Sequence, residues 1–146
     1  MPQPVPGFQA GMKRVKIVLS GWAEVMETMF GRTRSSHGIF QSVPSGGDAY
    51  MMKHIIHDWD DERSIQILKN CRSAMTDDGR VVIIETVIQP GNEPGFFKLL
   101  DVAMLTISGR ERTEEQFRSL YERAGLRLIR IIPTESTVSV IEGVRA

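Results

Sequence analysis

The chain has 146 residues, of which 18 are Lys or Arg and 18 are Asp or Glu, so its formal net charge is zero. That length suits one domain with a real core, and the balanced charge offers no basic face to a nucleic acid or an acidic membrane. No apolar stretch approaches the ~18 residues that a membrane span needs, and the N-terminus lacks the pattern of a secretory signal. Cys71 is the only cysteine, which excludes an intramolecular disulfide. We therefore expect a soluble cytoplasmic protein without a nucleic-acid or membrane partner.

The first 39 residues predict little regular structure apart from one strand and one helix. Residues 1–7 are rich in proline and predict a disordered lead-in. Val15–Leu19 is a short β-branched run, and apolar residues then recur at helical spacing from Trp22 to Phe30. We expect a strand, a turn and a helix here.

The middle of the chain predicts a strand followed directly by a helix. A mostly apolar run of strand length extends from Asp48 to Ile56, and the polar residues 57–60 follow where that strand should end. Acidic residues then place negative charge at a helix start, and a helical stripe continues to Met75. Asp78-Gly79 is the predicted stop signal of this helix.

The next segments predict a buried strand and two more helices. Arg80–Val87 has the near-continuous apolar character of a strand that is buried on both faces of a parallel sheet. Apolar residues recur at helical spacing across residues 96–107. Thr113 and Gln116 form a capping box before a last helix, which should stop at Gly125.

The chain closes with two β-rich runs, Leu126–Ile132 and Thr137–Val144, which predict a hairpin. Because strands and helices alternate before this hairpin, the sequence predicts an α/β fold. Its sheet should be predominantly parallel, with an antiparallel pair at the C-terminal end.

Three ionisable residues gather at the predicted carboxyl ends of the strands, where α/β sheets bind ligands. They are His57 after the second strand, Glu85 near the end of the third, and Glu111 in the loop before the capping box. A histidine held by carboxylates is a plausible general base, because its ordinary pKa of about 6.5 leaves the neutral form available at pH 7. Each residue also has an ordinary explanation: a helix cap or turn for His57, a strand end in water for Glu85, and a solvated charged loop for Glu111. Spacing alone does not choose between these readings.

A metal site is a weaker interpretation of the histidines. His54 and His57 are three residues apart, but a strand would place them on opposite faces, and no cysteine cluster accompanies them. Neither a dinucleotide-binding fingerprint nor a Walker sequence is present. We expect no metal and no nucleotide-phosphate loop.

From Phe40 onward the sequence carries several motifs in a characteristic order. They are Ser42-Val-Pro-Ser-Gly-Gly-Asp-Ala-Tyr-Met-Met-Lys-His-Ile-Ile-His-Asp-Trp-Asp-Asp-Glu, Leu68-Lys-Asn-Cys-Arg, Gly79-Arg-Val-Val-Ile-Ile-Glu, Leu100-Asp-Val-Ala-Met-Leu and Gly109-Arg-Glu-Arg-Thr. In these motifs the chain resembles the bacterial and plant O-methyltransferases that act on small hydroxylated compounds, the group of caffeic acid and hydroxyneurosporene methyltransferases. The resemblance implies that residues 40–146 are the C-terminal part of the catalytic domain, with part of a Rossmann-like class I methyltransferase sheet. Residues 1–39 would be a divergent N-terminal segment.

The resemblance also implies a reaction and its acid–base residues. His57 matches the general base that deprotonates the acceptor hydroxyl, and Glu85 and Glu111 match the two acids that orient its imidazole. The methyl group would come from S-adenosylmethionine. The acceptor would be a hydroxyl of a small phenolic or polyketide-like substrate, and no metal would be needed.

Three further positions match residues that surround the reacting groups in the family. Lys53 matches a lysine that lies against the cofactor. Asp58 and Trp59 match residues at the junction of acceptor and cofactor, and we expect Trp59 to bind the cofactor and Asp58 to contact the acceptor.

Residues 1–39 depart from the family pattern. The glycine-rich loop and the acidic residue that should hold S-adenosylmethionine are not visible there, and the helical domain through which the family dimerises has no counterpart. The expected partners include a homodimer or a partner chain. Two alternatives stay open: a non-enzymatic remnant that binds another protein through a sheet edge or apolar face, and a truncated gene product without an independent role.

Overall fold

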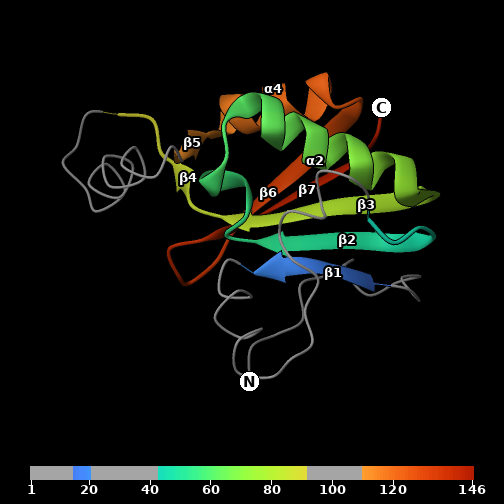
Figure 1. The fold of residues 1–146 in the computed structure, drawn as a ribbon. Helices are drawn as coiled ribbons and strands as arrows, with labels where there is room; N and C mark the ends of the chain where they lie inside the picture. The colour runs from blue at the N-terminus through green and yellow to red at the C-terminus, as the bar shows by residue number, and fades with distance from the viewer. Residues whose placement is uncertain (1–14, 21–42, 92–109) are drawn as a thin grey trace, which may run out of the picture.

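A computed structural model describes residues 15–20, 43–91 and 110–146, whose main feature is a five-stranded sheet (Figure 1). The strand order is β1-β2-β3-β7-β6. The first three strands run parallel, β7 runs antiparallel to β3, and β6 runs antiparallel to β7. The bounds are Val15–Ser20 for β1, Gly47–Lys53 for β2, Met75–Glu85 for β3, Leu126–Pro133 for β6 and Ser139–Arg145 for β7. The predicted α/β class, with a mostly parallel sheet and a closing antiparallel hairpin, is confirmed.

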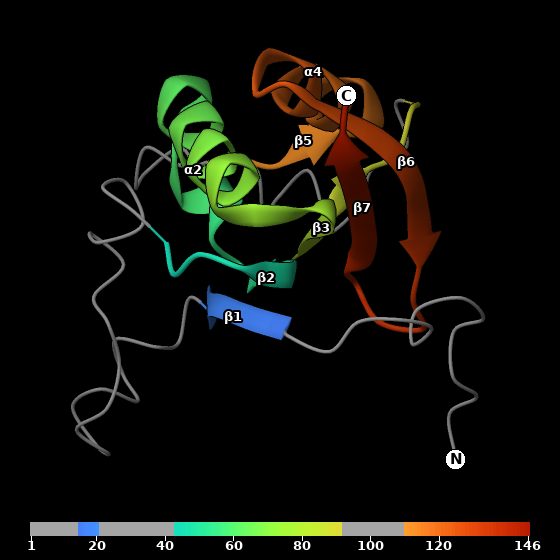
Figure 2. The same ribbon diagram turned by 90° about the vertical axis from the view of Figure 1, so that its right-hand side faces the viewer.

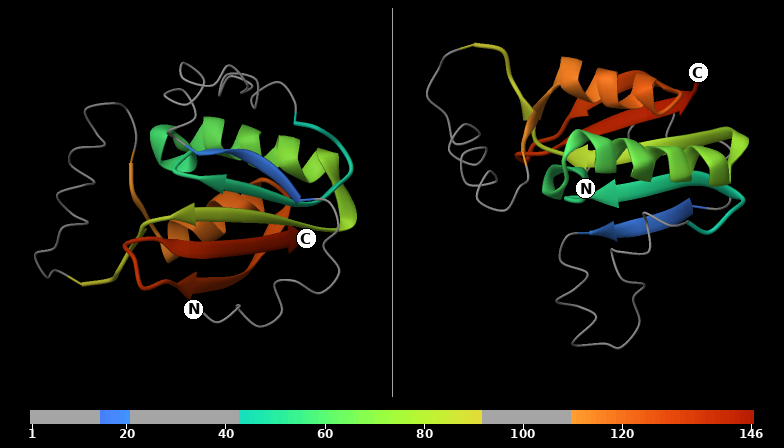
Figure 3. Two further views of the ribbon diagram at one scale, coloured as in Figure 1. Left: turned by 90° about the horizontal axis from the view of Figure 1, so that it is seen from below. Right: turned by 45° about the horizontal axis from the view of Figure 1, so that its top comes forward.

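Two helices, α2 (Asp61–Ala74) and α4 (Glu114–Arg123), cover the same face of this sheet, as Figures 2 and 3 show from three directions. Both begin where the sequence predicts. The Asp60 carboxylate accepts from the backbone N–H of Arg63, and the capping box before α4 forms with both of its hydrogen bonds. The helices and the sheet enclose one hydrophobic core, to which the largest contributors are Tyr50, Met52, Ile56, Ile67, Leu68, Ile83, Phe117, Leu120, Tyr121, Leu126 and Ile141.

Two predicted boundaries are wrong. Strand β2 ends at Lys53 rather than Ile56, because His54 adopts φ +53°, in the left-handed region, and turns the chain out of the sheet. Helix α2 ends at Ala74, and Asp78-Gly79 lies inside β3 instead of stopping the helix. The register explains the second error, since Gly47 pairs with Met75 but Ala49 pairs with Arg80, so the extra residues of β3 bulge outward with exposed acidic side chains.

Three short elements lie beyond the carboxyl ends of β2 and β3. A single 3-10 turn, η2, spans Ile56–Asp58, and β4 (Val87–Ile88) pairs in parallel with β5 (Arg112–Thr113) as a separate two-stranded sheet. In Figure 1 this small sheet lies at the end of the main sheet toward which β3 points. This arrangement brings segments around positions 57, 85 and 111 to one place.

Two predicted helices, at residues 22–30 and 96–107, lie outside the described residues. Neither of the helices that are described is long and apolar enough to cross a membrane.

Candidate active site

The imidazole of His57 is the centre of a cluster of acidic groups. His57 lies in η2, immediately beyond the end of β2, and its side chain is 14% exposed. Its Nδ1 lies 3.2 Å from Glu111 Oε1 and 3.9 Å from Glu85 Oε2, while its Nε2 lies 3.2 Å from Asp58 Oδ1. Both ring nitrogens therefore face carboxylates.

The two glutamates are fixed by the backbone and almost completely buried. Glu85 is the last residue of β3, and its Oε1 accepts from the backbone N–H groups of Ile55 and His57 at 3.0 and 3.1 Å. Glu111 directly precedes β5, and the backbone N–H of Arg110 donates to the carbonyl of His57 at 2.8 Å. Each glutamate side chain is 1% exposed. The acids thus hold both the ring and the main chain of the turn that carries His57.

This environment strongly favours the protonated imidazole. Burial opposes the charged ring, but hydrogen bonds to Asp58 and Glu111 and the charge of Glu85 outweigh it and raise the pKa of His57 to about 10. Burial raises the pKa of Glu85 to about 7, although His57 and the backbone donors oppose that rise. The neutral imidazole, which an ordinary pKa of about 6.5 would leave available at pH 7, is therefore disfavoured in this arrangement, because three carboxylates surround the ring.

A second histidine stacks on the first. The ring centroids of His54 and His57 are 5.2 Å apart with 29° between the planes. Burial, followed by the positive charges of His57 and Lys53, lowers the pKa of His54. The expectation that the two histidines lie on opposite faces of a strand is wrong, because β2 ends before either residue.

The remaining predicted residues surround this cluster. Lys53 is the exposed last residue of β2 and pairs with Ser20 of β1 and Ile84 of β3, so it lies at the carboxyl ends of three parallel strands. Trp59 is partly buried against the core, and the guanidinium of Arg63 lies 5.4 Å from its ring centroid. All six predicted site residues therefore lie at one end of the sheet.

Comparison with known proteins gives this geometry a context. The O-methyltransferase domain model matches residues 25–127. A phenazine O-methyltransferase, PhzM, from Lysobacter antibioticus is 46% identical over 104 residues, which are 70% of this chain and 30% of that protein. A mitomycin biosynthesis 6-O-methyltransferase from Streptomyces lavendulae is 38% identical over 96 residues, which are 64% of this chain and 27% of that protein.

The chain belongs to the O-methyltransferase domain family.

Solved structures agree with this assignment. The LaPhzM crystal structure superposes with a TM-score of 0.74 and 34% identity, over 90% of this chain and 42% of that one. CalO1, a methyltransferase of calicheamicin biosynthesis in its SAH-bound form, gives a TM-score of 0.69 and 40% identity, over 74% of this chain and 32% of that one. The chain spans about a third of the length of the curated relatives that it matches.

The burial of the two glutamates excludes their ordinary explanations, whereas His57 does lie in a turn, η2, although it does not cap the following helix. Asp60, and not His57, caps α2. Glu85 is buried against the turn, as expected for a residue that needs a donor, and does not face water. Glu111 is 3% exposed and so does not belong to a solvated loop.

Sequence reasoning missed the residue that joins these segments. Arg112 is completely buried and ion-paired to Asp61 at 2.9 Å, with further bonds to the carbonyls of Ile56 and Trp59. Its position inside the Gly109-Arg-Glu-Arg-Thr motif was visible, but a charged run gives no sign of burial. Partners on another element decide whether an arginine is buried.

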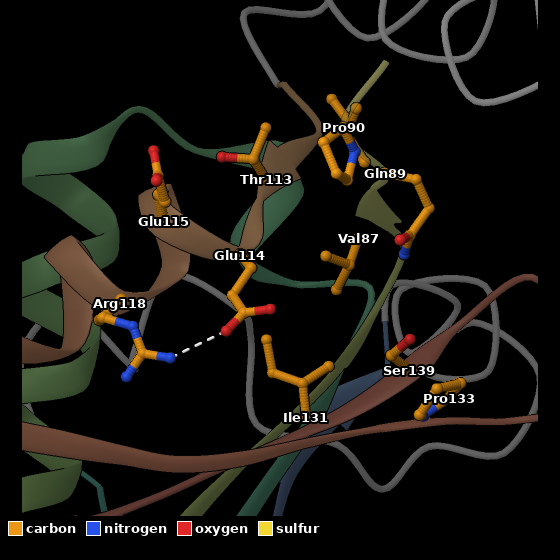
Figure 4. A pocket seen from close by; sticks show the side chains of 11 residues that line it. Val87, Gln89, Pro90, Thr113, Glu114, Glu115, Arg118, Ile131, Pro133 and Ser139 are labelled. Carbon is orange, nitrogen blue, oxygen red and sulfur yellow. Dashed lines mark hydrogen bonds and ion pairs between the residues drawn. The ribbon is translucent and has the colours of Figure 1, made fainter. Parts of the chain in front are cut away.

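A hollow of about 630 Å³ opens beside the cluster but does not include it (Figure 4). Residues of β4, the N-terminal turn of α4 and the β6–β7 hairpin line it, and Figure 4 shows the Glu114–Arg118 ion pair at its side. None of the six predicted site residues lines this hollow. We therefore do not place the acid–base chemistry there.

Proposed function

We propose that this chain forms the acid–base part of an O-methyltransferase site, in which His57 removes the proton from an acceptor hydroxyl. The observation that carries the proposal is the buried cluster of His57, Glu85 and Glu111 at the carboxyl ends of the strands. Such a cluster can hold a proton, orient the ring and keep water from its inner side. In this proposal residues 40–146 supply the cluster, and residues 1–39 are a divergent segment whose strand β1 extends the same sheet.

The geometry assigns different tasks to the two ring nitrogens. Nδ1 points to the two buried glutamates, which fix the ring and stabilise the charge that His57 acquires as a base. Nε2 points to Asp58, whose side chain is 39% exposed. An acceptor hydroxyl would therefore meet His57 at Nε2 and displace Asp58.

Displacing Asp58 also makes His57 a better proton acceptor. The hydrogen bond that His57 Nε2 donates to Asp58 is one of the causes that raise the pKa of His57 in the resting site. When the acceptor takes its place, that contribution is lost and the pKa of His57 falls, so the ring can release its Nε2 proton to solvent and then accept the proton of the hydroxyl at Nε2. The site is then ready to deprotonate the hydroxyl.

The residues present fit one side of an S-adenosylmethionine site. Lys53 and Trp59 lie at the carboxyl ends of the parallel strands, where open α/β sheets bind ligands, and three carboxylates nearby suit a cationic group. S-adenosylmethionine would supply an activated methyl group for attack by the deprotonated oxygen. Other cofactor contacts would come from residues 21–42, which lie outside the described part, or from a partner chain.

Relatives suggest the class of acceptor. Their names specify methylation of phenazine, scoulerine and 3-amino-4-hydroxybenzoate. We propose a small hydroxylated aromatic or polyketide-like acceptor for this chain as well. The single, buried thiol of Cys71 suits a reducing cytoplasm.

The test is transfer of isotopically labelled methyl from S-adenosylmethionine to a panel of small phenols, with native chain and His57→Ala. We expect His57→Ala to lower the rate by about 10² to 10⁴. Arg118→Ala, which removes only an exposed ion pair on α4, is the matched control and should keep the native rate. An active preparation in which His57→Ala retains the native rate would remove His57 from the mechanism.

Cofactor binding is tested separately by titration calorimetry. Because the acidic residue that should hold the ribose is not visible in residues 1–39, we expect the chain by itself to bind S-adenosylmethionine about 10² to 10⁴ times more weakly than a complete site. Low-micromolar binding would show that residues 13–31 supply the missing contacts.

A further inference from the structure

One guanidinium joins the two segments that carry the acid–base cluster. Arg112 extends from β5, directly after Glu111, and its side chain is fully buried. Nη1 donates to the carbonyl of Ile56 at 3.1 Å and Nη2 to the carbonyl of Trp59 at 2.8 Å. These two carbonyls bracket His57 and Asp58, so Arg112 holds the turn on both sides of the proposed base.

A carboxylate completes this connection. Asp61 Oδ1, in the first turn of α2, accepts from Arg112 Nη2 at 2.9 Å and from Nε at 3.2 Å, while Oδ2 accepts from Arg110 at 3.2 Å. Side chains alternate along an extended segment, so Arg110 and Arg112 reach Asp61 on one side and Glu111 projects to the other. Glu111 is thus fixed between two anchored neighbours.

We propose that Arg112 is a positioning residue that holds the Glu111 carboxylate against Nδ1 of His57 by tying both segments to one guanidinium. The proposal rests on the function proposed above. Arginine suits this task because its planar group offers five donors in a fixed arrangement, whereas lysine offers one compact charge. A buried arginine with this many partners is not needed simply to fill the core, since an apolar side chain of similar volume would do so.

The test compares Arg112→Lys and Arg112→Met in the full chain, with Arg118→Met as the matched control. Arg118 also pairs with a carboxylate, at 2.8 Å, but it is exposed and does not contact the turn. The primary readout is the pKa of His57 from an NMR titration of the histidine Cε1–H signals. The sequence has only three histidines, and the His57 signal is the one missing in His57→Gln.

Besides Glu111, the carboxylates of Glu85 and Asp58 raise the pKa of His57, and the ring of His54, on which Lys53 acts, stacks on the imidazole. None of these groups is bonded to Arg112 in the described residues, but Arg112 holds the carbonyls on both sides of His57 and Asp58, so a fall in the pKa of His57 reports the carboxylates that Arg112 positions, Glu111 foremost. We expect the pKa of His57 to fall by about 1 to 3 in Arg112→Met, to fall less in Arg112→Lys, and to stay unchanged in Arg118→Met. Where methyl transfer is measurable, the pH–rate profile of the Arg112 variants should shift in the same direction.

Two results would overturn the proposal. One is a folded Arg112→Met or Arg112→Lys, judged by cooperative urea unfolding, whose His57 keeps its native pKa. If both variants fail to fold, Asp61→Asn supplies the measurement, because Asp61 is partly exposed at the start of α2. The second overturning result is an unchanged pKa of His57 in Asp61→Asn.

The titration also separates this inference from the proposed function, because it needs no catalysis. If the chain proves inactive but the Arg112 variants still lower the pKa of His57, the positioning role stands and only the proposed activity fails.

Discussion

The carboxylate of Glu111 is the partner of His57 whose removal tests the site most directly. Glu111→Gln keeps the shape of the side chain and removes its charge. The Oε1 atom lies 3.2 Å from Nδ1 and both groups are largely buried, so screening by water is weak. An opposite charge this close typically changes a pKa by about 1 to 3. We therefore expect the pKa of His57 to fall from about 10 to between about 7 and 9.

The same substitution should change stability in a pH-dependent way. The pKa of His57 is raised in the folded chain, so its stabilising effect is present below about pH 6.5 and is lost as the pH rises toward 10. Glu111→Gln removes part of that effect. Because a pKa shift of one unit corresponds to about 1.4 kcal/mol, the free energy of unfolding of the variant should be lowered by about 1 to 4 kcal/mol more at pH 6 than near pH 10.

An NMR titration of the histidine signals gives the pKa, and urea unfolding at the two pH values gives the free energies. Glu122→Gln, which removes an exposed carboxylate from α4, is the control and should leave both unchanged. If the pKa of His57 in Glu111→Gln stays within about 0.3 of the native value, Glu111 does not stabilise the imidazolium. The assignment of acid–base roles would then fail.

Three more changes test the surrounding structure. Asp58→Asn should lower the pKa of His57 at least as much as Glu111→Gln does, because Asp58 both accepts the hydrogen bond from Nε2 and acts through its charge; a smaller decrease in the same titration would contradict this. Burial raises the pKa of Glu85 to about 7, so its contribution to the free energy of unfolding should be lost as the pH rises from about 4.5 through 7. Glu85→Gln should make the free energy of urea unfolding depend less on pH in this range, and an unchanged pH dependence would contradict this. Gly143→Ala would place a Cβ 2.2 Å from Cε1 of the buried Tyr121 ring and should lower the free energy of urea unfolding by about 2 to 5 kcal/mol. A decrease below about 0.5 kcal/mol would contradict the close packing of Tyr121 on Gly143.

Local signals in the sequence predict much of the fold correctly. The capping box at Thr113, the acidic start of α2 and the β-rich runs of the hairpin depend on neighbours within a few residues. Local hydrogen bonds and periodicity are sufficient to specify such elements. The same is true of the parallel sheet, since strands alternating with helices leave few other ways to bury the apolar runs.

The composition of the candidate site was also accessible from the sequence, because family motifs name His57, Glu85 and Glu111 together. The protonation state of His57 was not accessible from the sequence. A histidine alone suggests a pKa near 6.5, whereas three carboxylates on different elements raise the pKa of His57 to about 10. Charge interactions depend on distances that only the assembled sheet sets.

Tertiary structure alone decided three further features. Strand β2 ends at Lys53 because the chain turns at His54, although the apolar run continues. Asp78-Gly79 joins β3 because pairing with β2 accommodates the extra residues as a bulge. Arg112 is buried because the carbonyls of the His57 turn and the carboxylate of Asp61 satisfy its donors. The sequence by itself determined the two described helices and the five strands of the main sheet, since those depend on near neighbours, but not the short elements η2, β4 and β5. Long-range partners determined where the elements end and which charges are buried, because a buried polar group is stable only when another segment supplies its hydrogen bonds.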